Sequence, residues 1–141
     1  MTKPFRIRAY APEDTAAVID LLQEVSIFRP SAREIPRLAE TFGSVPNLYA
    51  CVVIQGHRLI GFGSVFFLTR IRGGCSATIE DVAVAADVRG QGIGREIIND
   101  LLRAARLRGC FKVTLESAES ADSFYKSIGF ESSGKVMKIF F

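Results

Sequence analysis

Residues 89–95 of this 141-residue chain read Arg89-Gly90-Gln91-Gly92-Ile93-Gly94-Arg95, and the segments on either side differ in periodicity. Residues 78–84 are mostly β-branched, which is typical of a strand, whereas residues 93–107 repeat apolar residues at helical spacing. Glycines lack a Cβ atom, so the backbone N–H groups of such a turn can converge on a phosphate. The first turn of a helix adds unpaired N–H groups and a partial positive charge. The stretch therefore predicts an anion site at a strand-to-helix turn, where Arg89 and Arg95 would add charge-assisted hydrogen bonds.

The glycine spacing excludes two common phosphate sites. A Rossmann dinucleotide site has Gly-x-Gly-x-x-Gly after its first strand, but here Gly90, Gly92 and Gly94 alternate and follow the fourth predicted strand. A P-loop ends in Gly-Lys-Ser or Gly-Lys-Thr, which this stretch lacks. An ordinary strand-to-helix turn without a ligand remains an alternative.

The rest of the chain predicts strands and helices in the order β-α-α-β-β-β-α-β-α-β, an α/β arrangement without an internal repeat. The predicted strands cover residues 5–10, 49–55, 59–68, 78–84 and 111–115. The predicted helices begin at Pro12 and near Ser31 and cover residues 93–107 and 120–128, and a last extended region covers residues 130–141.

The bulk composition fits one globular domain that spans residues 1–141. Its 48% hydrophobic and 23% charged residues lie near the globular average, and a chain of this length can bury a core. No apolar run reaches the ~20 residues of a membrane span. The N-terminus turns polar at once and lacks the apolar region of a secretion signal. We therefore expect a cytoplasmic protein with no membrane partner.

Cysteine, histidine and charged residues point to neither a metal nor a nucleic acid. Cys51, Cys75 and Cys110 are odd in number and lack Cys-x-x-Cys spacing, which predicts reduced thiols, and the single His57 lies in a turn-like stretch. Residues 70–112 hold eight basic and five acidic residues, which accounts for the net charge of +3. We expect these basic residues to cluster beside the glycine turn. Because they lack interleaved aromatic residues, we expect no nucleic-acid partner.

The glycine turn resembles the Arg/Gln-x-x-Gly-x-Gly/Ala signature of the GNAT superfamily of acyl-CoA-dependent N-acetyltransferases, matched by Arg89, Gly92 and Gly94. The resemblance implies an α/β (α+β) GNAT fold, a single mixed, mostly antiparallel sheet of about six to seven strands flanked by about four helices. It also implies that the turn cradles the pyrophosphate of acetyl-CoA, and that the preceding strand parts from its neighbour to bind the pantetheine arm. The residues implied to bind acetyl-CoA are Val82, Ala83, Val84, Arg89, Gly90, Gln91, Gly92, Ile93, Gly94, Arg95 and Tyr125.

Within the superfamily, residues 79–84, 109–116 and 124–130 are similar to the glucosamine-6-phosphate N-acetyltransferases, and the similarity covers about residues 70–138. This resemblance implies direct transfer of the acetyl group of acetyl-CoA to a primary amine, without a metal. Tyr125 would protonate the leaving coenzyme A thiolate. Glu116 would reach the substrate of the neighbouring subunit in a homodimer.

The resemblance places Glu80, Asp81 and Val82 against the amine and hydroxyls of the sugar, with Asp81 or Glu80 assisting deprotonation. Adjacent residues on a strand point to opposite faces, so both carboxylates reach one pocket only if the strand is bulged. A carboxylate that accepts the proton of the substrate ammonium typically contributes 10²- to 10⁴-fold to the rate. We favour Asp81 as this base.

The sequence specifies the reaction more narrowly than it specifies the acceptor. The residues expected to bind it are Glu80, Asp81, Val82 and Glu116, with Arg29, Lys135 and Lys138 as candidates for a sugar phosphate. Ala121 stands where this family usually has asparagine, and Thr78 where a histidine is common. A small-molecule amine such as glucosamine 6-phosphate is our first expectation. Another small amine, a protein amine, or an acyl-CoA-binding module without turnover remain open.

Overall fold

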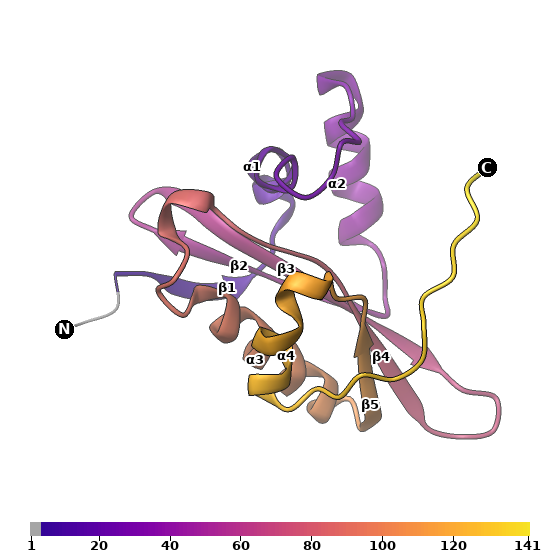
Figure 1. The fold of residues 1–141 in the computed structure, drawn as a ribbon. Helices are drawn as coiled ribbons and strands as arrows, with labels where there is room; N and C mark the ends of the chain where they lie inside the picture. Colours follow the sequence, from indigo (N-terminus) through magenta and orange to yellow (C-terminus); the bar gives the residue numbers. More distant parts are fainter. Residues whose placement is uncertain (1–3) are drawn as a thin grey trace.

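The computed structural model describes residues 4–141 and contains one five-stranded sheet in the order β1-β2-β3-β4-β5 (Figure 1). Neighbouring strands are antiparallel except for the parallel pair β4 and β5. The strands are β1 (Arg6–Ala9), β2 (Leu48–Gln55), β3 (Arg58–Thr69), β4 (Cys75–Val84) and β5 (Cys110–Leu115). The helices are α1 (Thr15–Leu22), α2 (Ile35–Gly43), α3 (Ile93–Leu107) and α4 (Asp122–Ile128). Short 3-10 turns are η1 (Pro12–Asp14), η2 (Ala32–Glu34), η3 (Ala86–Val88) and η4 (Glu119–Ala121).

Helices cover both faces of the sheet (Figure 1). The pair α1 and α2 lies on one side, and α3 and α4 lie on the other. Ile97, Ile98 and Leu101 of α3 are fully buried against the sheet. A Cβ atom at Gly63 of β3 would lie only 2.6 Å from Cγ2 of Ile97. The absence of a side chain at Gly63 therefore lets α3 approach the sheet closely.

The sequence predictions of the central elements are confirmed. The hairpin of β2 and β3 turns at Gly56, and the helix predicted over residues 93–107 is α3. The strand predicted over residues 78–84 begins earlier, at Cys75, because Gly73 and Gly74 both adopt positive φ and complete the turn from β3 in fewer residues. No helix among residues 4–141 has the length and apolar character needed to cross a membrane.

The expected sheet of about six to seven strands is larger than the one described, which has five strands within residues 4–141. The difference lies in the last segment, residues 131–141, which is extended but pairs with no strand of the described chain. Every residue of that segment is exposed, and Figure 1 shows its last part extending away from the sheet. An extended segment becomes a strand only when a neighbour satisfies its backbone groups, and residues 131–141 form no backbone pairing with the free edge of β5.

Candidate active site

A bulge in β4 sets the positions of the two candidate bases. Phe62 of β3 pairs with Ala83 and Ser64 pairs with Glu80, so Asp81 and Val82 together face the single residue between. Asp81 has a φ of 55°. Within residues 4–141 it is the one non-glycine residue with a positive φ. Aspartate tolerates this left-handed conformation better than most residues. The bulge interrupts the strict alternation of side chains at this point, so Glu80 and Asp81 need not point to opposite faces of the sheet.

Ser64 supports the bulge from the neighbouring strand. Its side chain is 1% exposed, and its hydroxyl donates a hydrogen bond of 2.8 Å to the carbonyl oxygen of Glu80. Sequence reasoning missed this residue, because an isolated serine within a strand carries no signal until the register is known.

The strand β4 continues beyond its partner β5. The parallel pairing ends where Ile79 meets Leu115, whereas β4 runs on to Val84. A cleft of about 1220 Å³ lies along β5, between that strand, the C-terminal part of α3, α4 and the segment that follows α4, and Thr78 and Glu80 of β4 also line it. The residues predicted from the sequence that line it are Glu80, Glu116, Tyr125 and Lys135. Asp81 is not part of this lining.

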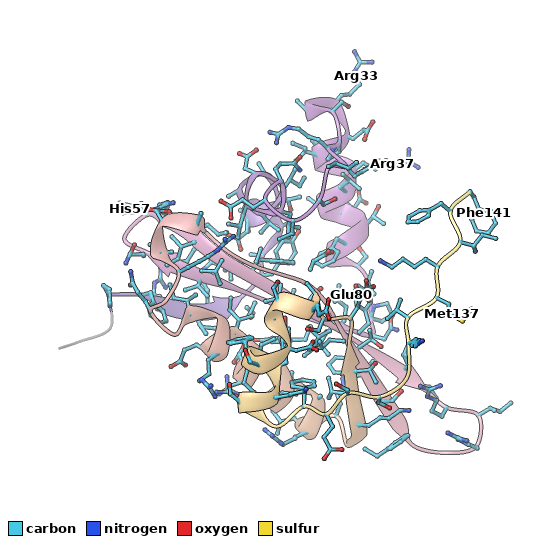
Figure 2. All side chains as sticks on the ribbon, viewed as in Figure 1. Arg33, Arg37, His57, Glu80, Met137 and Phe141 are labelled. Carbon is cyan, nitrogen blue, oxygen red and sulfur yellow. The ribbon has the colours of Figure 1, made fainter. Side chains whose placement is uncertain are left out.

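Glu80 combines a position on the cleft with an altered acidity. Glu80 is exposed to solvent and is labelled near the centre of Figure 2. Partial burial of its carboxyl raises its pKa, and the nearby negative charges of Asp81 and Glu116 raise it further. Glu116 itself forms an ion pair with Lys138 at 2.7 Å. A carboxylate with a raised pKa is a better acceptor for the proton of an ammonium group.

Tyr125 lies on α4 with a half-buried ring. The ring packs edge-on against Phe124 and Phe130, with centroid distances of 5.0 Å and 5.8 Å. Burial raises the pKa of its hydroxyl, so this group stays protonated at neutral pH. Within residues 4–141 the hydroxyl has no hydrogen-bond partner, which leaves it available as a donor to a ligand in the cleft.

The glycine turn has the backbone geometry that an anion requires. Gly90 and Gly92 adopt φ values of 83° and 82°, and a Cβ atom at either would meet nothing within 4 Å. Gly92 is the N-cap of α3 and supplies no side-chain cap, so no side chain of this residue competes for the N–H groups of the first turn. At Gly94, a Cβ atom would lie 3.3 Å from the Phe124 ring, so this glycine allows α4 to pack against α3. The turn therefore leaves the space around its backbone free of its own side chains.

Both arginines beside the turn already have partners in the protein. Arg89 donates from Nε to the carbonyl oxygen of Val84 at 3.2 Å and forms an ion pair with Glu24 at 3.3 Å. Arg95 donates to the hydroxyl of Ser127 at 2.7 Å. These contacts hold the guanidinium groups next to the turn. Glu24 was missed from the sequence, because it lies 65 residues from Arg89 and belongs to no motif.

The prediction that the basic residues within residues 70–112 cluster beside the turn is wrong for most of them. Arg89 and Arg95 flank the turn, but Arg70 and Arg72 lie in the connection from β3 to β4. The other basic residues near the end of α3 and the start of β5, Arg106, Arg108 and Lys112, lie at that same end of the strands. The end of β4 and the start of α3 meet at the turn, so the start of β4 and the end of α3 lie far from it.

The candidates for a sugar phosphate are separated in the structure. Lys135 lines the cleft and Lys138 pairs with Glu116, so both lie near the candidate base. Arg29 lies in the connection between α1 and α2, where it forms an ion pair with Asp20 at 2.6 Å and does not line the cleft.

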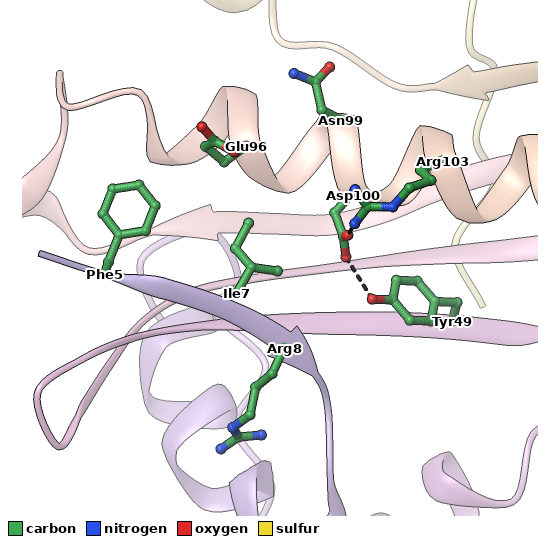
Figure 3. A pocket seen from close by; sticks show the side chains of 8 residues that line it. All are labelled: Phe5, Ile7, Arg8, Tyr49, Glu96, Asn99, Asp100 and Arg103. Carbon is green, nitrogen blue, oxygen red and sulfur yellow. Dashed lines mark hydrogen bonds and ion pairs between the residues drawn. The ribbon is translucent and has the colours of Figure 1, made fainter. Parts of the chain in front are cut away.

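A second hollow of about 410 Å³ lies between β1, β2 and α3 (Figure 3). Its most buried polar group is Asp100, which accepts a 2.6 Å hydrogen bond from Tyr49 and pairs with Arg103. The carboxylate of Asp100 is thereby satisfied by the protein. No residue predicted from the sequence as part of a site lines this hollow. In residues 4–141 there is also no group of three or more His, Cys, Asp or Glu residues that could hold a metal ion.

Comparison with known proteins identifies the family of the chain. The sequence model of the acetyltransferase (GNAT) family matches residues 16–130. The chain belongs to the GNAT family. The chain is therefore a GNAT N-acetyltransferase with an α+β GNAT fold. The enzymes of this family use an acyl-CoA cosubstrate.

Three similar proteins align with most of this chain. The glucosamine 6-phosphate N-acetyltransferase of Trypanosoma brucei brucei is 36% identical over 139 residues, which are 94% of this chain and 93% of that protein. A thialysine N-epsilon-acetyltransferase of Mus musculus is 26% identical over 141 residues, covering 88% of this chain and 82% of that protein. The crystal structure of glucosamine-6-phosphate N-acetyltransferase from Arabidopsis thaliana matches with a TM-score of 0.91 and 25% identity, covering 99% of both chains.

Proposed function

We propose that this GNAT enzyme transfers the acetyl group of acetyl-CoA to the primary amine of an amino-sugar phosphate, with glucosamine 6-phosphate as the acceptor. The observation that carries the proposal is the 36% identity to the trypanosomal glucosamine 6-phosphate N-acetyltransferase over nearly the full length of both chains. The cleft supports it, because a carboxylate, a tyrosine hydroxyl and a lysine line the same space.

Glu80 is the base in this proposal. Its carboxylate accepts a proton from the substrate ammonium, and the neutral amine then attacks the thioester carbonyl carbon directly. We place Glu80 ahead of Asp81 because Glu80 lines the cleft and has the raised pKa. Asp81 then contributes its backbone conformation to the bulge and its negative charge to the acidity of Glu80. Tyr125 donates its proton to the leaving thiolate.

The cosubstrate follows β4 and the glycine turn. In this proposal the peptide groups of residues 82–84, which lie past the last pairing with β5, bond the pantetheine arm and the thioester oxygen, and the Val84 carbonyl would first have to leave Arg89. The diphosphate is held at the turn and the first residues of α3. The turn residues proposed for this contact are Arg89, Gly90, Gln91, Gly92, Ile93, Gly94 and Arg95.

Lys135 is the residue best placed for the phosphate of the acceptor. It lines the cleft, whereas Lys138 would first have to leave Glu116 and Arg29 would have to leave Asp20. Val82 is half-buried beside Glu80 on the bulge but is not part of the cleft lining, so its contact with the sugar stays a prediction from the resemblance.

A homodimer is part of the proposal. The last residues expose large apolar side chains, with exposed fractions of 93% at Met137, 88% at Phe140 and 115% at Phe141. Apolar surface of this kind is usually covered by a partner. A second copy is the occupant we propose, and in that arrangement Glu116 would reach the acceptor bound by the neighbouring subunit.

A smaller free amine is the second candidate acceptor. The mouse thialysine N-epsilon-acetyltransferase also aligns over most of the chain, at 26% identity. Thr78, which stands where a histidine is common in the sugar-phosphate enzymes, lines the cleft beside Glu80.

Release of coenzyme A thiol, measured with purified protein, distinguishes the acceptors. Glucosamine 6-phosphate, unphosphorylated glucosamine and thialysine are compared at equal concentration with acetyl-CoA. We expect the highest kcat/KM with glucosamine 6-phosphate, and a selective rise of its KM in Lys135→Met. Higher turnover with thialysine, or equal turnover with both sugars, would rule out the sugar-phosphate assignment.

A further inference from the structure

Cys75 and Cys110 form a close pair of thiols that the acetyl-transfer chemistry does not use. Their sulfur atoms lie 3.0 Å apart, although the residues are 35 positions apart in the chain. Each is the first residue of its strand, and the two are direct partners in the parallel ladder of β4 and β5. Both cysteines are free and only partly buried.

We propose that Cys75 and Cys110 are a reversible modification site, closing to a disulfide that links β4 to β5 at their paired ends. Adjacent strands lie about 4.7–4.9 Å apart, which falls within the Cα separations of 4.4–6.8 Å found in disulfides. A disulfide bond is about 2.05 Å long, so the two sulfur atoms need to approach by only about 1 Å.

The surrounding backbone permits this approach. Gly74 precedes Cys75 and Gly109 precedes Cys110, and both glycines have positive φ. A Cβ atom at Gly109 would meet nothing within 4 Å, so the start of β5 has room to adjust. The pair also lies at an exposed end of the sheet, since Phe111 next to Cys110 is 59% exposed. A small reagent can therefore reach it.

The oxidant in this proposal is a low-molecular-weight disulfide such as oxidised glutathione. One cysteine loses its proton, and its thiolate attacks a glutathione sulfur, which breaks the glutathione disulfide and releases one glutathione thiolate. The second cysteine then loses its proton and attacks the protein sulfur of the mixed disulfide, which releases the second glutathione. Two cysteine thiols are oxidised, one glutathione disulfide is reduced, and the two protons go to the two glutathione thiolates.

The third cysteine provides an internal reference. Cys51 of β2 is fully buried, and burial raises the pKa of its thiol to about 12. Burial and the neighbouring Cys75 raise the pKa of Cys110 to about 11, so oxidation of the pair is expected to be faster in mildly alkaline buffer. Cys51 remains a thiol throughout because no reagent reaches it.

The test is a thiol count and an intact mass of the full chain before and after treatment with oxidised glutathione. We expect two of the three thiols to disappear, the mass to fall by two hydrogens, and peptide mapping to join the fragments that contain Cys75 and Cys110. A reducing agent should restore all three thiols. The linked form should melt roughly 5–10 °C higher, because the bond closes a long loop of the unfolded chain.

Three variants complete the design. Cys51→Ser should still lose two thiols and two hydrogens of mass on oxidation and gain thermal stability, whereas Cys75→Ser and Cys110→Ser should lose the mass change and the thermal shift. The proposal is overturned by persistence of all three thiols, by stable glutathione adducts, by cross-linked dimers on a non-reducing gel, or by a lower melting temperature of the linked form. None of these outcomes depends on which amine the enzyme acetylates.

Discussion

Glu80→Gln and Asp81→Asn are a matched pair that separates the two neighbouring carboxylates. Each change removes one negative charge and keeps the shape of the side chain. Asparagine, like aspartate, tolerates the φ of 55° at position 81, so the bulge should survive the second change. We expect Glu80→Gln to abolish the base and Asp81→Asn to leave it in place.

The expected magnitudes differ by orders of magnitude. Loss of a general base costs about 10²- to 10⁴-fold in kcat, or about 2.7–5.4 kcal/mol in activation free energy. For Asp81→Asn we expect less than about a tenfold loss, since Asp81 does not line the cleft. Removal of its charge also lowers the pKa of Glu80, so the acid limb of the pH profile should move to lower pH.

The assay is thiol release as a function of pH, combined with thermal melting of each variant. Asp81→Ala serves as the conformational control. A left-handed alanine costs about 1–2 kcal/mol, so this variant should melt several degrees lower while Asp81→Gly and Asp81→Asn stay near the parent. A loss in Asp81→Asn equal to or greater than that in Glu80→Gln, with melting unchanged, would refute the assignment of Glu80 as the base.

Further changes test the turn, the packing and the electrostatics. Gly92→Ala forces a side chain into a φ of 82°, so the free energy of unfolding should fall by about 1–2 kcal/mol and the Kd for coenzyme A should rise in calorimetric titration. Gly63→Ala would place a Cβ atom 2.6 Å from Ile97, and denaturant unfolding should show a loss of about 1–3 kcal/mol or more. Glu116→Gln removes a charge that raises the pKa of Glu80, so the acid limb of kcat/KM should move to lower pH; an upward shift would contradict the electrostatic assignment.

The strand, glycine turn and helix around residues 89–95 could be predicted from the sequence, because each is specified by local chemistry. The period of apolar residues defines α3, and the alternating glycines define the turn before it. The hairpin of β2 and β3 is local for the same reason.

The conformation of β4 could not be predicted, because it depends on register. Nothing in the local sequence says that Asp81 and Val82 together face one residue of β3. Whether Glu80 or Asp81 lines the cleft follows from that bulge, and the support from Ser64 becomes visible only with the strands paired. The sequence alone therefore does not separate the two carboxylates, whereas the cleft lining includes Glu80 and not Asp81.

Residues 130–141 show a second reason why part of the fold could not be predicted from the sequence. The extended character of residues 130–141 follows from their composition, but whether they pair with the edge strand β5 depends on the packing of distant segments. Contacts between distant segments, such as Arg89 with Glu24, likewise depend on how α1 packs near the turn.

A crystal structure of the protein with coenzyme A tests the central claim about the glycine turn most directly. We predict that the diphosphate accepts hydrogen bonds from backbone N–H groups of residues 90–94, and that the thiol end enters the cleft beside Tyr125. A diphosphate bound elsewhere on the molecule, with the N–H groups of the turn bonded to protein side chains, would contradict the account.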